Sequence, residues 1–208
     1  MKTIAFVATK GGTGKSSLCF GAGIEAAKRG SVYFVDMDPQ RSLTEICARR
    51  RNELFEKNPA LLADVVSLPE GIATLKRTHF ERDYLLVDTP GSMMKVIKDA
   101  IAVADCIILP VQQSPLDILA QEDAAHYILE AGKQDVAFFV MNRIQGQAKT
   151  GDLVARIKTV FPNPPVKINQ RVVYANALIS GKSAAEIDSK AAEEMAALWA
   201  AIDKILQR

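Results

Sequence analysis

A glycine-rich segment near the start of the chain constrains the fold more than any other feature of the sequence. An apolar run over residues 4–8 leads into residues 9–17, which read TKGGTGKSS, and a helical pattern follows to residue 28. A strand, a glycine-rich turn and a helix in this order are the context of a phosphate-binding loop. Glycines allow the tight turn in which consecutive N–H groups converge on phosphate oxygens, and the helix adds the positive end of its dipole.

The residue types within this loop indicate separate roles. We expect the Lys15 ammonium to reach the β- and γ-phosphates and the Ser16 hydroxyl to bind Mg²⁺. The other members of the predicted phosphate site are Gly11, Gly12, Thr13, Gly14 and Ser17. Thr9 stands where the strict G-x-x-x-x-G-K-[ST] pattern has its first glycine, so the motif departs from that pattern at one position. The alternative is a glycine-rich β–α turn that carries a surface lysine.

Two further apolar strands end in acidic residues. Residues 31–35 lead into Asp36 and Asp38, and residues 84–87 lead into Asp88. Acids at the carboxyl ends of strands beside a phosphate loop are well placed for Mg²⁺ and its water ligands. The alternative for the first pair is capping of the helix predicted from residue 43, because Asp and Ser favour that position.

The order of the apolar segments predicts the fold class. Strands alternate with helices from residue 4 to residue 168, which favours an α/β fold with a mostly parallel central sheet and helices on both faces. We expect a single domain over residues 1–208. A final helix over residues 184–206 carries an apolar stripe that should dock on the sheet. Its members are Ile187, Ala191, Met195, Leu198, Ile202 and Ile205.

The composition excludes some classes of protein. The 26 basic and 24 acidic residues leave a net charge of +2, which is too small for a strongly basic, histone-like binder. No apolar run is long enough to span a membrane. Three cysteines without a C-x-x-C pair are expected to be buried thiols in a reducing compartment. The arginine run at residues 49–51 is expected to be solvated or to face a partner, with phosphate-backbone contact as the alternative.

Three motifs in this order resemble the deviant Walker A ATPases of the ParA/MinD superfamily, and most of all its short ParA-type partition members. They are residues 10–17, 36–40 and 88–91, and the resemblance covers essentially the whole chain. It implies a P-loop NTPase fold in which Asp36 and Asp88 hold the Mg²⁺ shell. By the same resemblance, Asp38 orients or activates the attacking water. Lys10 would be the second lysine, which reaches across a dimer interface to the partner's nucleotide.

The resemblance also indicates how the base is bound. Asn142 ends the predicted strand over residues 136–143 and resembles the family's adenine-recognition asparagine. An amide presents a donor and an acceptor together, which suits the edge of adenine. We assign Asn142 and the adjacent Arg143 to nucleotide binding, with a role in capping the strand as the alternative for Asn142.

The family resemblance implies a function. We expect an ATPase that binds Mg²⁺ and ATP, forms an ATP-sandwich homodimer and hydrolyses ATP to ADP and phosphate, with stimulation by a ParB-like or other small adaptor. It would act in the cytoplasm, over the nucleoid, and bind DNA without sequence specificity while it positions plasmid, chromosome or other cargo. No N-terminal DNA-binding extension is expected. The candidate DNA contacts are Lys149, Arg156, Lys158, Lys167, Arg171 and Lys182.

Two alternative functions remain open from the sequence. One is a metabolic P-loop phosphotransferase or ligase that acts on a small molecule. The other is a MinD-like membrane-associated regulator, in which the final helix would lie on the bilayer. Glu186, Glu193, Glu194 and Asp203 oppose that second alternative, because an anionic membrane would repel them.

Overall fold

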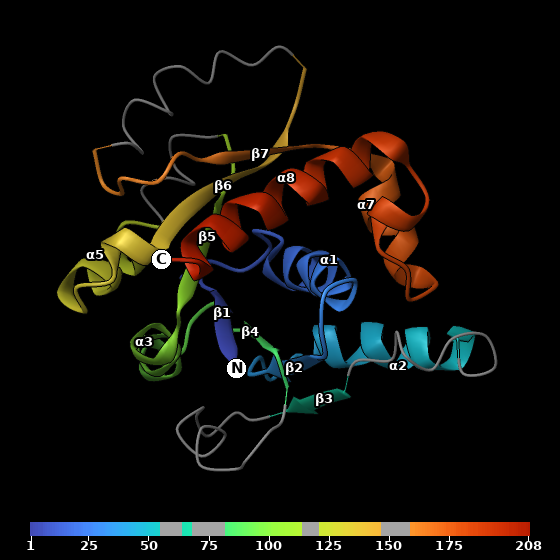
Figure 1. The fold of residues 1–208 in the computed structure, drawn as a ribbon, viewed down its shortest axis with the longest axis horizontal. Helices are drawn as coiled ribbons and strands as arrows, with labels where there is room; N and C mark the ends of the chain where they lie inside the picture. The colour runs from blue at the N-terminus through green and yellow to red at the C-terminus, as the bar shows by residue number, and fades with distance from the viewer. Residues whose placement is uncertain (55–63, 68–81, 114–120, 147–158) are drawn as a thin grey trace.

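The computed structural model describes residues 1–54, 64–67, 82–113, 121–146 and 159–208. Within these ranges the chain forms one seven-stranded sheet, and every strand pair in it is parallel. The strands are β1 (Lys2–Phe6), β2 (Val32–Asp36), β3 (Asp64–Ser67), β4 (Tyr84–Asp88), β5 (Cys106–Val111), β6 (Ala137–Ile144) and β7 (Val166–Asn169). The order across the sheet is β3-β2-β4-β1-β5-β6-β7 (Figure 1). The predicted fold class is confirmed, although β3 was not among the predicted strands.

Helices cover both faces of this sheet, as predicted (Figure 1). One face is covered by α1 (Lys15–Ala27), α2 (Ser42–Leu54) and α8 (Ser189–Leu206), and the other by α3 (Met94–Val103) and α5 (Glu122–Glu130). The short helices η3 (Gln134–Val136), α7 (Val172–Ile179) and η4 (Ala184–Glu186) complete the described elements. The sequence also predicts helices over residues 71–80 and 150–161, and the first and most of the second lie outside the described residues.

The central strand β1 shows how the two cores arise. Ile4 and Phe6 belong to the core beneath α1 and α8, whereas Ala5 and Val7, the residue after the strand, belong to the core beneath α3 and α5. Successive side chains of a strand face opposite sides, so a strand covered on both faces must be apolar throughout. This explains why β1 reads as a continuous apolar run. The three cysteines are buried free thiols, as predicted.

The C-terminal segment differs from its prediction in one respect. Its apolar stripe from Met195 to Ile205 is buried against the sheet, so the docked position is confirmed, while Ala191 is buried against Ala177 and Ala184. However, α8 begins only at Ser189, because the Asp188 carboxylate accepts a hydrogen bond from the Ala191 N–H at 2.8 Å and caps the helix. Ile187 therefore lies before the helix and is 56% exposed instead of buried. Among the described helices, none has the length and apolar character that crossing a bilayer requires.

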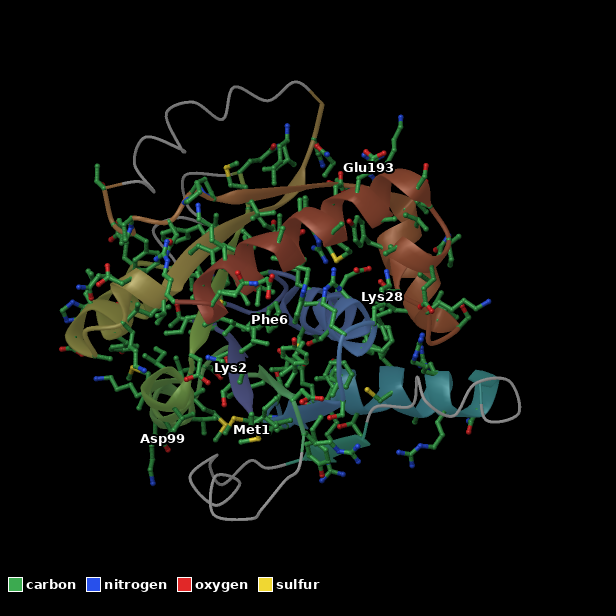
Figure 2. All side chains as sticks on the ribbon, in the orientation of Figure 1. Met1, Lys2, Phe6, Lys28, Asp99 and Glu193 are labelled. Atoms are coloured by element: carbon green, nitrogen blue, oxygen red, sulfur yellow. The ribbon has the colours of Figure 1, made fainter. Side chains whose placement is uncertain are left out.

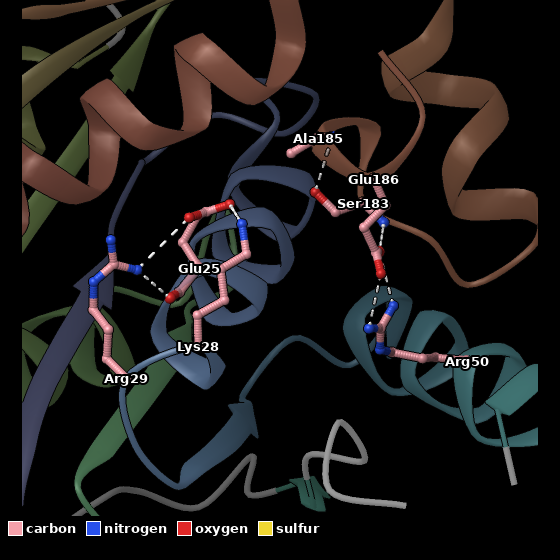
Figure 3. A network of polar contacts seen from close by, with 7 residues as sticks. All are labelled: Glu25, Lys28, Arg29, Arg50, Ser183, Ala185 and Glu186. Atoms are coloured by element: carbon pink, nitrogen blue, oxygen red, sulfur yellow. Dashed lines mark hydrogen bonds and ion pairs between the residues drawn. The ribbon is translucent and has the colours of Figure 1, made fainter. Parts of the chain in front are cut away.

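One member of the arginine run is buried, which contradicts the prediction of a solvated cluster. Arg50 on α2 is 2% exposed and forms two hydrogen bonds of 2.9 and 3.1 Å with the Glu186 carboxylate (Figure 3). Its guanidinium also donates to the carbonyl oxygen of Gly181 at 3.1 Å and lies over the ring of Phe20. Arg49 has an exposed side chain beside Glu45. The contacts of Arg50 join α2 to the segment between α7 and α8.

Candidate nucleotide-binding site

The glycine-rich loop connects β1 to α1 at the middle of the sheet, where the sequence predicts a phosphate-binding loop. Gly12 and Gly14 have φ values of 77° and 92°, a left-handed conformation that favours glycine. A Cβ atom on Gly14 would lie 2.3 Å from the amide nitrogen of Asn142. Gly91, which follows β4, also packs closely, since its Cβ would lie 3.0 Å from the Gly11 nitrogen. The loop is therefore enclosed by neighbouring segments.

Three side-chain amides from other segments hold the backbone of this loop. The Gln121 oxygen accepts a hydrogen bond from the Thr9 N–H at 3.2 Å. The Gln112 amide donates to the carbonyl oxygen of Gly12 at 3.1 Å, and the Asn142 amide donates to that of Thr13 at 2.7 Å. The bonds to the Gly12 and Thr13 carbonyl oxygens hold the loop without using the N–H groups of these residues, which are the groups that such a loop directs at phosphate. Gln112 and Gln121 were not predicted to belong to the site, since no local sequence pattern marks them.

Asn142 has more partners within the protein than the sequence indicates. Its Nδ2 is bound to the loop, and its Oδ1 accepts a hydrogen bond from the Arg143 N–H at 3.0 Å. The side chain is 6% exposed. In this structure the amide therefore fixes the loop, and these bonds use one of its two N–H donors and one of the two acceptor positions of its oxygen. Arg143 is exposed and has a left-handed φ of 55°.

Lys15 lies at the first position of α1 and is only 6% exposed. Its ammonium group donates to the Lys10 carbonyl oxygen at 3.5 Å, so the side chain folds back over the loop. Burial lowers the pKa of Lys15, and the charges of Asp88 and Asp38 oppose that effect. Lys10 itself is exposed, on the same loop.

The acidic residues at the ends of β2 and β4 are neighbours in the sheet, because Asp36 pairs with Asp88 in the parallel register. Asp36 is buried, and its carboxylate accepts hydrogen bonds of 2.8 Å from both the N–H and the hydroxyl of Thr44. It also accepts a bond of 3.1 Å from the Asp38 N–H. The alternative role of Asp36, in capping the start of α2, is thus present in this structure. Asp38 accepts a bond of 2.9 Å from the Gln40 N–H.

Asp88 is the unusual acid of the site. It is fully buried, and neither carboxylate oxygen has a hydrogen-bond partner within the described part of the chain. Burial raises the pKa of Asp88 to about 7, against the opposing influence of the Ser16 hydroxyl and the Lys15 ammonium. A buried carboxylate without a partner is suited to a cation or its water ligands. Asp88 and Ser16 therefore fit the predicted Mg²⁺.

The described residues contain no group of three His, Cys, Asp or Glu side chains that could hold a metal ion. A Mg²⁺ site does not need such a group, because proteins usually supply one or two carboxylates and the phosphates and waters complete the shell. Asp36, whose oxygens already accept three bonds, is better placed to orient a water ligand than to bind the ion directly.

The pKa of Asp88 predicts how stability depends on pH. An ordinary Asp ionises near pH 4, so between about pH 4 and 7 the folded chain binds the extra proton and its stability falls as pH rises. In metal-free buffer, the unfolding free energy of the wild type should fall between pH 5 and pH 8. In Asp88→Asn this fall should be smaller by about 2–3 kcal/mol. Urea unfolding at both pH values measures this, with Asp99→Asn on α3 as the control. Equal losses in wild type and Asp88→Asn would show that Asp88 ionises normally.

Two adjoining cavities open around the loop. The first, the loop cavity, has a volume of about 780 Å³ and is lined by the phosphate loop, residues 38–40 and residues 90–93. The second, the side cavity, has a volume of about 640 Å³ and is bordered by Asn142, residues 169–172 and α7. They share Gly14, Ser17, Arg143 and Leu178. Cavities of this size hold small-molecule ligands and cofactors, and the pair could accept a phosphate chain and the nucleoside attached to it.

A phosphate loop after the central strand of a parallel sheet, with acids at the ends of the adjacent strands, defines a P-loop nucleotide-binding protein. The pattern of the CobQ/CobB/MinD/ParA nucleotide binding domain matches residues 4–184. The chain belongs to this family. The predicted resemblance to the ParA/MinD superfamily is therefore confirmed.

Relatives support this assignment. The chain is 28% identical over 194 residues to the maintenance of carboxysome distribution protein A of Halothiobacillus neapolitanus, covering 90% of this chain and 88% of that protein. A Cyanothece McdA variant in complex with ATP has the same fold, with a TM-score of 0.75, 18% identity and coverage of 98% and 96% of the two chains. A chain of the MinC:MinD cell division protein complex of Aquifex aeolicus is similar at a TM-score of 0.71, 18% identity and coverage of 100% and 97%.

Proposed function

We propose that this chain is a Mg²⁺-dependent ATPase that forms a homodimer over bound ATP and uses its hydrolysis to position or partition a cargo. The observation that carries the proposal is the unpartnered, buried Asp88 beneath a preformed phosphate loop. This carboxylate is costly to bury alone, and a cation bound with a nucleotide would offset that cost. ATP is the proposed nucleotide because the chain belongs to the ParA/MinD family and because a relative in that fold is bound to ATP.

The proposed site divides the work among a few residues. Backbone N–H groups of residues 11–17 and the Lys15 ammonium bind the phosphates, while Ser16 and Asp88 hold Mg²⁺ with Asp36 behind them. When bound, Mg²⁺ neutralises phosphate charge. Asp38 borders the loop cavity and would orient the attacking water. Lys10 of the second copy would stabilise the charge that develops on the transferred phosphate, as an arginine finger does elsewhere.

The cargo and partners are proposed from relatives. One relative is named for carboxysome distribution, and another is seen in complex with MinC. We therefore propose a cytoplasmic protein that works with a small adaptor and uses non-specific DNA as its surface. Among the candidate DNA contacts, Lys167 is exposed, whereas Arg171 is ion-paired with Glu194. Lys149, Arg156 and Lys158 lie outside the described residues.

A Lys10→Ala variant tests the dimeric mechanism. It should bind ATP within about threefold of the wild type, because Lys10 acts on the other copy's nucleotide, but lose at least about tenfold in ATP turnover. Binding is measured by calorimetry, turnover by phosphate release, and association by light scattering with a non-hydrolysable ATP analogue. The control is Lys204→Ala, which removes an exposed lysine from α8.

Three results would count against this proposal. Wild-type turnover by Lys10→Ala would remove the role of this lysine. A wild-type chain that stays monomeric at saturating ATP analogue would remove the dimer, and substrate-stimulated turnover without DNA would favour a metabolic phosphotransferase.

A further inference from the structure

Gly91 brings the segment that follows β4 into contact with the peptide group that joins Lys10 to Gly11 (the 10–11 peptide). A Cβ atom on Gly91 would lie 3.0 Å from the Gly11 nitrogen and 3.2 Å from the Lys10 carbonyl carbon. Both are backbone atoms, which cannot turn aside as the end of a flexible side chain can. The φ value of Gly91 is not positive, so an alanine there would meet no backbone strain of its own. The contact alone is therefore the reason to expect an effect from a side chain at this position.

The segment that carries Gly91 is held in place by its neighbours. Thr89 is fully buried, and its hydroxyl donates a hydrogen bond of 2.9 Å to the carbonyl oxygen of Phe6, the last residue of β1 (Figure 2). Pro90 is also buried, and its ring fixes its φ. Residues 10–12 of the loop, by contrast, are exposed. An added methyl group on Gly91 would therefore displace the 10–11 peptide, by a few tenths of an ångström.

The 10–11 peptide connects the two lysines of the phosphate loop. Lys10 is one of the residues that it joins, and its carbonyl oxygen accepts the hydrogen bond of 3.5 Å from the Lys15 ammonium. Glutamine side chains hold the loop on either side of this peptide, at Thr9 and at Gly12. Gly91 adds a contact between these two fixed points, where the backbone determines the direction in which the Lys10 side chain leaves the loop.

We propose that Gly91 is a positioning residue for Lys10, because the absence of a side chain lets the 10–11 peptide lie where Lys10 can reach the nucleotide of the second copy. The inference rests on the proposed function, in which Lys10 stabilises the charge on the transferred phosphate. A misplacement of about 1 Å in such a group can cost about 100-fold in rate, so a shift of a few tenths should cost several-fold. Gly91 also lines the loop cavity, so direct contact with phosphate is the alternative that a test must separate.

A double-mutant cycle with the full chain tests this role. Gly91→Ala should lower ATP turnover, measured by phosphate release, by about fivefold, while its ATP affinity, measured by calorimetry, stays within about threefold of the wild type. In a chain that already carries Lys10→Ala, the same change should lower turnover by less than about twofold, because the lysine that it displaces is absent. Gly132→Ala is the control, since a Cβ there meets no atom within 4 Å and the residue borders neither cavity. Its left-handed φ affects stability but not the site.

Each other outcome overturns a stated part. Wild-type turnover in Gly91→Ala, or an equal fall in Gly132→Ala, overturns the inference. So does a fall that persists in the Lys10→Ala chain, or an equal loss of turnover and ATP affinity, because Gly91 would then act on phosphate or on the whole loop. Wild-type turnover in Lys10→Ala alone overturns the proposed function instead. If Gly91→Ala does not fold, Thr89→Val removes the hydroxyl that holds the same segment, and its loss of turnover should likewise depend on Lys10.

Discussion

Lys15→Ala is expected to bind ATP at least about 100-fold more weakly than the wild-type chain. The ammonium is 6% exposed and lies at the start of α1, inside the loop that would surround the phosphates. Its charge also interacts with those of Asp88 and Asp38, which both raise its pKa against the effect of burial. Without Lys15, a phosphate chain would enter a pocket whose remaining side-chain charges include these two acids, so the loss should exceed that of an ordinary hydrogen bond.

Calorimetric titrations with ATP and with tripolyphosphate measure this effect. Both affinities should fall together, because Lys15 is assigned to the phosphates and not to the base. Lys204→Ala removes the same charge at an exposed position and should leave both unchanged. A loss smaller than about threefold in Lys15→Ala would show that the lysine does not contact phosphate, whatever the family resemblance implies.

The sequence predicted the part of the site that depends on the order of neighbouring segments along the chain. A strand, a glycine turn and a helix follow one another within residues 2–27, and the acids end strands that the apolar pattern identifies. In a parallel sheet, strand ends meet at one edge, which is why Asp36 and Asp88 become neighbours although 52 residues separate them. The local sequence pattern and this one rule of sheet topology were sufficient to predict that the two acids lie together.

The contacts that hold the loop could not be predicted in this way. Gln121 lies 112 residues from Thr9, Gln112 lies 100 residues from Gly12, and Asn142 lies 129 residues from Thr13. A glutamine after a strand has the same local signature whether it holds a loop or faces water. Only the packed arrangement of β1, β5 and β6 identifies these partners.

The C-terminal segment shows a different cause of error, because its local signals were present. Ser183 and Glu186 form a capping box around η4, and Asp188 caps α8. The apolar spacing predicted one long helix and placed Ile187 in its buried stripe, whereas the caps divide the segment and expose that side chain. The capping residues set the helix boundaries here, so a prediction from apolar periodicity alone was wrong.

Arg50→Ala should lower the unfolding free energy by about 2–4 kcal/mol, which for a chain of this size is a fall of roughly 5–15 °C in Tm. The guanidinium is buried, and its removal leaves the Gly181 carbonyl without this donor and Glu186 without its paired charge (Figure 3). Arg49→Ala is the matched control, since that neighbour is half exposed and its ion pair with Glu45 should contribute less than about 0.5 kcal/mol.

The same pair of variants separates a local role from a wider one. Arg50 joins α2 to the segment that follows α7. The first turn of α2 is held by the hydrogen bond between Thr44 and Asp36, and α7 borders the side cavity. If the contacts of Arg50 also maintain the shape of the side cavity, Arg50→Ala should weaken ATP binding at a temperature where the variant is still folded. Tripolyphosphate binding should change less. Urea unfolding measures the loss of stability, and calorimetry measures the loss of ATP affinity. Both are done about 15 °C below the variant's Tm, where the variant is still folded. Equal stability of Arg50→Ala and Arg49→Ala would mean that the buried ion pair contributes no more than an exposed one, and that α2 is held by its apolar face alone.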